Sequence, residues 1–178
     1  SDESLYHPSR LGTAGTDCPS VIAGENRTWR LWYQAGDTPL GAGVQVRFYC
    51  VGQRSLGDSI QCMQPDQSGY VEIESAPASL RLKATVLGFE VEAGEMRAGD
   101  RVVLRIGREK GFSWTPLAGR KDLSVIVHVG RGEPQCRLPE PVVIRVLPDT
   151  AERVEILLPG TRPAGGADQN TVTCAWNS

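Results

Sequence analysis

Apolar and polar residues alternate one by one along most of this chain, which is the pattern of β-strands that bury one face. The clearest case follows an Ala-Gly-Asp turn: Val102, Leu104 and Ile106 fall on one face of a strand, and Val103 and Arg105 fall on the other. Similar segments lie before and after it. We therefore expect this strand to lie in the middle of the fold.

The same alternation recurs along the chain, with Gly and Pro between the segments. The other strands predicted in this way include residues 28–34, 44–51, 70–74, 80–86, 122–129, 142–146 and 154–158. No long stretch free of Gly and Pro carries apolar residues at every third or fourth position, so no helix is predicted. The pattern predicts an all-β fold, an immunoglobulin-like antiparallel β-sandwich of about 9–10 strands. Two long loops are expected, at residues 52–69 and 108–121.

The points where the alternation starts and stops divide the chain into three regions. Residues 1–20 are rich in turn-forming residues without periodicity, so an N-terminal arm is expected there. The β-sandwich is expected over residues 21–160, with 154–158 pairing with 142–146 in a hairpin. Residues 161–178 indicate a flexible connection followed by a terminal strand.

Charge and hydropathy narrow the range of partners. The net charge is -2 and both signs are spread along the chain, so there is no basic stripe for nucleic acid and no polybasic segment for an anionic membrane. The longest apolar runs, such as 125–129, are far too short for a membrane helix, so membrane insertion is not expected. Proteins and glycans remain as candidate partners.

Five cysteines without a C-x-x-C spacing disfavour a zinc ribbon or a thioredoxin-like motif and favour disulfides. Cys50 and Cys62 are the candidate pair, because Cys50 ends a predicted strand and Cys62 lies in the following loop. Cys18, Cys136 and Cys174 can hold a second pair with one free thiol, or three free thiols; the odd count also permits a bridge between chains. Disulfides imply an extracellular, cell-surface or periplasmic location. The alternative is five reduced cysteines in a cytosolic protein.

Residues with catalytic potential are few and scattered. Of the two histidines, His7 lies in the predicted arm and His128 in a predicted strand. The sequence pattern places no acid or nucleophile beside either of them. Glu72 and Glu74 share a strand face, a spacing that is commoner on a solvated strand than in a glycosidase. The sequence therefore predicts no enzyme activity, no cofactor and no metal site.

Two surface features are candidates for recognition. Trp32 and Tyr49 lie opposite the expected core residues of their strands, so their rings could form a flat platform for a sugar; the alternative is that they are core. Asn26 begins an Asn-Arg-Thr acceptor pattern for N-glycosylation, a short motif that often occurs by chance.

Four segments together resemble the N-terminal β-sandwich region of a bacterial family of unknown function. The segments are Ala23-Gly24 with the strand 29–33; residues 41–46 leading to 64–66 and 69–71; residues 98–107; and residues 141–159. They cover about residues 20–160 in the order that family shows. Full-length members carry a metal-dependent hydrolase-like domain of the PHP type, marked by Trp-Gly-Asp-Leu-His. That string does not occur here, so the resemblance transfers no metal ligand to this chain.

Three functions are compatible with this sequence. The first is a non-catalytic, exported β-sandwich module that acts through its surface, with a protein partner such as a neighbouring domain. The second is a structural subunit of a cell surface or fibre that self-associates into a homo-oligomer, because either end of the chain can add to a neighbour's sheet edge. The third is a carbohydrate-binding module that uses Trp32 and Tyr49 to hold a glycan.

Overall fold

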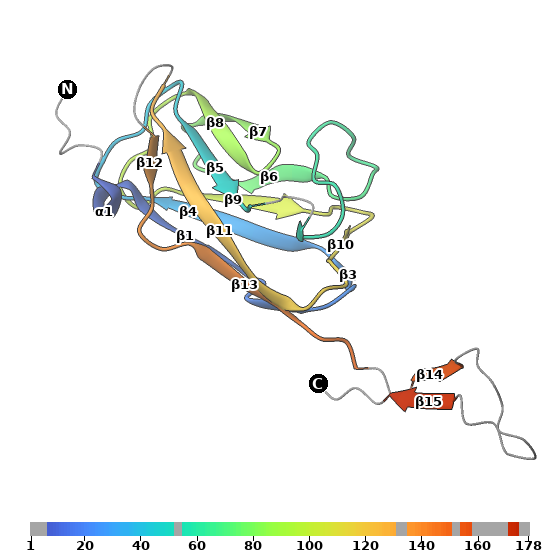
Figure 1. Ribbon diagram of the computed structural model, residues 1–178. Helices are drawn as coiled ribbons and strands as arrows, with labels where there is room; N and C mark the ends of the chain where they lie inside the picture. The colour runs from blue at the N-terminus through green and yellow to red at the C-terminus, as the bar shows by residue number, and fades with distance from the viewer. Residues whose placement is uncertain (1–6, 52–54, 131–134, 151–153, 158–170, 175–178) are drawn as a thin grey trace, which may run out of the picture.

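The computed structural model describes residues 7–51, 55–130, 135–150, 154–157 and 171–174, and nearly all of their regular structure is β-strand (Figure 1). The one helix in these ranges, α1 (Pro8–Leu11), has four residues. The prediction of an all-β fold is therefore confirmed.

One layer is an antiparallel sheet, here called the β1 sheet. In spatial order it contains β1 (Gly12–Thr16), β4 (Trp29–Ala35), β9 (Arg101–Ile106) and β6 (Val71–Ser75). Burial alternates along β4 as the sequence predicts: Trp29, Leu31 and Tyr33 are buried, and the residues between them are half-buried. The strand expected in the middle of the fold is β9, which pairs with both β4 and β6.

The second layer, here called the β11 sheet, covers the other side of the core. In order it contains β2 (Ser20–Ile22), β13 (Val142–Leu147), β11 (Gly119–His128), β5 (Gln45–Tyr49), β8 (Gly88–Ala93) and β7 (Arg81–Thr85), and β12 (Gln135–Arg137) also pairs with β11. All pairings are antiparallel except that of β2 with β13, which is parallel.

The two sheets hold their strands as an immunoglobulin variable domain does. That domain has strands A, B, E and D in one sheet and G, F, C, C′ and C″ in the other. Here β1, β4, β9 and β6 take the first set of places, and β13, β11, β5, β8 and β7 take the second. The chain order differs, because β6 comes before the hairpin β7–β8. After β5 the chain therefore crosses to the β1 sheet, where it forms β6. It then returns to the β11 sheet, where β8 pairs with β5 and β7 pairs with β8.

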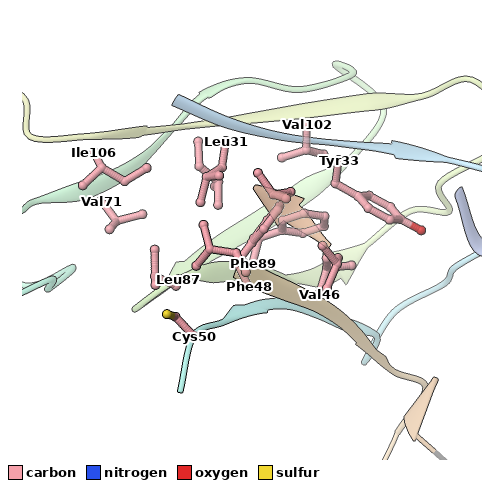
Figure 2. Close-up of a cluster of buried hydrophobic side chains, with 14 of the residues drawn as sticks. Leu31, Tyr33, Val46, Phe48, Cys50, Val71, Leu87, Phe89, Val102 and Ile106 are labelled. Atoms are coloured by element: carbon pink, nitrogen blue, oxygen red, sulfur yellow. The ribbon is translucent and has the colours of Figure 1, made fainter. Parts of the chain in front are cut away.

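The core lies between the two sheets and is built from the inward residue of each alternating pair. Figure 2 shows Leu31 and Tyr33 facing Val46 and Phe48 across the interior. These four side chains have at most 2% of their surface exposed. Full burial of such a side chain contributes about 1.5–3 kcal/mol, so this contact between sheets is the main source of stability.

At each end of the sandwich the structure differs from one expectation. Residues 8–16, expected in an arm, form α1 and β1, and the Tyr33 hydroxyl donates a hydrogen bond to the Leu11 carbonyl beneath them. Residues 154–157 (β14) pair with β15 (Thr171–Cys174) and not with β13. The physical reason is that β13 has β11 on one side, and on the other side β2 already pairs with Arg145–Leu147, the end of β13 from which the chain continues.

The second predicted loop is partly structured. β10 (Phe112–Ser113) pairs with β3 (Asn26–Arg27), and β11 begins at Gly119, inside the expected loop. The rings of Phe112 and Trp114 lie 5.8 and 4.7 Å from that of Trp29, measured between centroids. This aromatic cluster closes one end of the sandwich.

Candidate functional site

The predicted aromatic platform is not formed. Trp32 lies on β4 and Tyr49 on β5, so the two rings belong to different sheets. Both alternate with core residues, which places them on opposite outer faces of the sandwich. The Arg101 guanidinium also lies over the Trp32 ring, 4.2 Å from its centroid. Alternation gave the outward direction of each ring correctly but carried no information on which sheet holds which strand.

An ion-pair network covers the outer face of the β1 sheet. Arg30 contacts Glu74 at 2.7 Å and Asp17 at 3.3 Å, and Arg105 contacts Glu74 at 3.5 Å and also pairs with Glu72. The hydrogen bond from Arg30 lowers the pKa of Glu74 below its ordinary value. The two glutamates that share a strand face are thus each held by arginine, an arrangement that ties β4, β9 and β6 together.

The predicted disulfide between Cys50 and Cys62 is not formed, and both residues carry free thiols. Cys50 has the same strand parity as Phe48 and turns into the core with 5% of its surface exposed. Cys62 lies in the loop next to Gln61, whose backbone forms an isolated parallel β-bridge with that of Tyr70. Cys18 is also a free thiol, and burial raises its pKa.

Asn26 has a structural role in the fold. Its side-chain amide donates to Ser113 Oγ at 2.9 Å and to the Lys110 carbonyl at 3.3 Å. Thr28, the third residue of the acceptor pattern, donates to the Gly107 carbonyl at 2.6 Å. In the folded chain the nitrogen that would carry a glycan is therefore engaged, and glycosylation of Asn26 stays a prediction.

Neither a metal site nor a membrane span is found in the described ranges. No group of three or more His, Cys, Asp or Glu side chains there is arranged to hold a metal ion. No helix in them is long and apolar enough to cross a membrane. His128 lies on β11, where burial and the nearby Arg47 charge lower its pKa.

A cleft of about 340 Å³ opens along the edge of β1. One wall is formed by Gly12, Thr13 and Ala14 of β1, and the other by Leu138, Pro139 and Glu140, which link β12 to β13. β1 pairs with β4 only, so within the described residues the edge of β1 away from β4 has no strand partner. β13 lies close to β1 but does not pair with it, so the cleft joins an unpaired backbone edge to a wall that presents Pro139 and the carboxylate of Glu140.

The edge strands at the other side of the sandwich differ from β1. β6 and β7 lie next to each other there. β6 carries Glu72 and Glu74, β7 carries Arg81 and Lys83, and the pairing register of each strand shifts once. Charges and bulges of this kind prevent a sheet edge from pairing with another chain. β1, with the sequence Gly-Thr-Ala-Gly-Thr, has no charge and pairs in one unbroken register of five residues.

A smaller cleft of about 250 Å³ lies on the β11 sheet, beside Gln45, Arg47 and Thr85. It is bounded by the turn between β7 and β8 and not by a strand edge. The cleft beside β1 is therefore the candidate functional site. One sequence signal for this site is the uncharged run of small residues at 12–16, but without knowledge of the strand pairing that run indicates only a loop.

Two solved structures are distantly similar to this chain. No family model and no curated protein matches the chain. The structure described as "AvmM Catalyzes Macrocyclization in Alchivemycin A Biosynthesis" is similar with a TM-score of 0.37 and 9% identity, over 77% of this chain and 89% of that chain. A family 123 glycoside hydrolase from Clostridium perfringens is similar with a TM-score of 0.31 and 9% identity, over 72% of this chain and 22% of that chain. These TM-scores are too low to bear on function, and membership of the PHP-type family stays a prediction.

Proposed function

We propose that this chain is a non-catalytic β-sandwich module that binds an extended segment of a partner protein along the open edge of β1. The observation that carries the proposal is the cleft beside β1, an edge strand of five residues that, unlike β6 and β7, has neither charge nor bulge. Strand addition supplies affinity through main-chain hydrogen bonds and specificity through the side chains that enter an adjoining groove.

The two walls of the cleft suit different parts of such a segment. Gly12, Thr13 and Ala14 offer backbone groups and small side chains, so another backbone can approach closely. Pro139 is exposed and offers apolar surface to a side chain of the added strand, Leu138 lies buried beneath it, and Glu140 adds an exposed carboxylate. The preferred segment is therefore extended, free of proline over the paired residues, and apolar at every second position.

Peptide selection tests this function without knowledge of the natural partner. Random peptides displayed on phage are selected on the immobilised chain, and their dissociation constants are measured for the wild type and for Thr13→Lys. Thr13 is exposed on β1, so a lysine there adds the kind of charge that protects β7. We expect binding to weaken by about tenfold or more.

Ser79→Lys is the matched control, because Ser79 is exposed just before β7 and receives the same charge. It should leave the affinity for selected peptides unchanged. The proposal fails if no peptide is enriched, or if the two lysine variants bind the selected peptides equally well.

Self-association is a second candidate function, and the same feature favours it. Two copies whose β1 edges pair with each other would form one continuous sheet. Light scattering distinguishes the two functions, because self-association requires a dimer that Thr13→Lys dissociates. A monomer at all concentrations removes this second candidate and leaves the first intact. Export of the chain stays a prediction from its cysteine content.

A further inference from the structure

The cleft of about 250 Å³ on the β11 sheet, which we call the turn cleft, has chemistry of its own. It is lined by residues of β5 and of the turn that joins β7 to β8, namely Gln45, Arg47, Phe48, Thr85, Val86 and Leu87. It shares no lining residue with the cleft beside β1. An inference about the turn cleft therefore does not rest on the proposed function.

A glycine leaves the space between two of the lining residues. Gly88 of β8 is the register partner of Arg47 on β5 and of Thr85 on β7, so the three residues form one row across the sheet. The neighbouring Val46 and Phe89 are buried in the core, which places this row on the outer face. A Cβ built on Gly88 lies 2.0 Å from the Val46 carbonyl oxygen, so the middle of the row accepts only glycine. The gap between Arg47 and Thr85 is therefore built into the sheet.

Two polar side chains at this gap have no partner within the described part of the chain. The Thr85 hydroxyl oxygen is buried and has no hydrogen-bond partner there. The Arg47 side chain is exposed, and its guanidinium makes neither a hydrogen bond nor an ion pair with a described residue. Buried polar groups without a partner are rare, because their loss of hydration is not compensated. A ligand that brings oxygen acceptors would satisfy both groups.

The charges on the surrounding face favour an anionic ligand. Arg137 lies in the same row as Arg47, because both are register partners of Ile126 on β11. Glu90 also faces outward, but its register partner on β7 is Lys83, and it forms no ion pair with Arg47 among the described residues. Positive charge therefore exceeds negative charge among these outward side chains.

The size and the apolar surface of the turn cleft limit the kind of anion. Its volume is below the range of about 300–1,000 Å³ that is usual for drug-sized ligands. Phe48 and Leu87 turn into the core, as Figure 2 shows, whereas Val86 is 41% exposed and offers apolar surface. An arginine guanidinium holds a carboxylate with two parallel hydrogen bonds. The expected ligand is thus small and combines a carboxylate with a compact apolar part.

We propose that the turn cleft binds a small organic acid. The carboxylate of the acid accepts hydrogen bonds from the Arg47 guanidinium and from the Thr85 hydroxyl, and its apolar part packs on Val86. Binding thereby gives a partner to the two polar groups that lack one within the described residues.

Titration of the full chain with benzoate, followed by NMR of the backbone amides, tests the site. Benzoate combines a carboxylate with a compact apolar ring, and benzamide has nearly the same shape without the charge. We expect saturable shifts at residues 45–47 and 85–88, with a dissociation constant of about 10 mM or lower for benzoate. Benzamide should bind about tenfold more weakly or not at all. The peptide acetyl-Ala-Ala-Ala, which carries a free carboxylate on a peptide chain, should also bind more weakly than benzoate.

Two variants test the assigned contacts. Arg47→Gln should weaken benzoate binding by about tenfold or more, and Thr85→Val by about threefold or more. Thr85→Val should not lower the free energy of unfolding, because it removes a buried hydroxyl without a partner among the described residues. Weaker binding by this variant is therefore distinct from a failure to fold.

Arg145→Gln is the matched control, because Arg145 is also an exposed arginine of the β11 sheet but does not line the turn cleft. It should bind benzoate as the wild type does. The absence of saturable shifts with benzoate overturns the proposal, as does equal binding of benzamide or unchanged binding by Arg47→Gln. Binding of the peptide as tight as that of benzoate also overturns it, because the cleft would then accept the end of a protein chain equally well.

Discussion

The two sides of the sandwich where the sheets end differ in how far their edge strands are protected from pairing. At one side, β6 and β7 carry charged residues, and each has an irregular register. At the other side, β1 is regular, uncharged and open to a cleft. An exposed regular edge is a risk for aggregation, so sheet proteins normally block it. This contrast within one domain is the basis for the proposed binding of a partner strand at β1.

The close contact of β1 with β4 depends on Gly12. Replacing this glycine is expected to have the largest effect on stability of the changes predicted here. Gly12 has a φ of +126°, and a Cβ built there lies 2.0 Å from the Gln34 carbonyl oxygen. Because the clash is with backbone, Gly12→Ala should lower the free energy of unfolding by about 2–3 kcal/mol. Urea unfolding measures the change. Gly41→Ala, with no atom within 4 Å of the added Cβ, should change stability by less than about 0.5 kcal/mol. Equal stability of the two variants would contradict this account of β1.

The ion pairs on the β1 sheet should contribute less. Arg30 lowers the pKa of Glu74 in the folded chain, so the pair stabilises the fold above the pKa of the unfolded glutamate. This contribution is lost as the pH falls through the folded pKa. Because the side chains are 37% and 28% exposed, Glu74→Gln should cost no more than about 1 kcal/mol at neutral pH.

The difference between Glu74→Gln and the wild type should shrink as the solution is acidified below pH ~4.5. Glu109→Gln removes an exposed carboxylate and serves as the control. Unfolding curves measured at several pH values give the comparison. A difference that stays constant down to acid pH would show that the Arg30–Glu74 pair does not stabilise the fold.

The smallest effect is expected where charge is removed from the protected side. Arg81→Thr/Lys83→Thr makes β7 uncharged like β1 but leaves the register shift between Arg81 and Leu82. We expect no new peptide binding and no self-association, because a shifted ladder does not offer a regular edge. Titration with the peptides selected on the wild type checks this. A second binding site in this variant would mean that charge alone protects β7.

The sequence predicted the inward and outward directions of most strand residues, because alternation in a strand fixes them locally. Tyr33, Val46 and Phe48 are buried as expected, and Trp32 and Tyr49 face outward. The same parity places Cys50 inward beside Phe48, a signal against the disulfide with Cys62. The sequence pattern could not predict which sheet each strand joins, because that depends on contacts between segments far apart in the chain.

The candidate site was missed for the same reason. Gly12–Thr16 contains only small residues, so it has no alternation to mark it as a strand. Its place beside β4 comes from contacts made by other segments, including the buried Leu11 and Tyr33. The cleft wall at Leu138 and Pro139 is more than a hundred residues away along the chain, and only the packed sandwich brings the two walls together.

Hydrogen exchange of the β1 amides with and without a selected peptide tests the central claim most directly. If a partner strand adds to the open edge, exchange of residues 12–16 slows on peptide binding, while that of residues 81–85 in β7 does not change. Unchanged exchange in β1 at saturating peptide, or equal slowing in β7, would contradict the account.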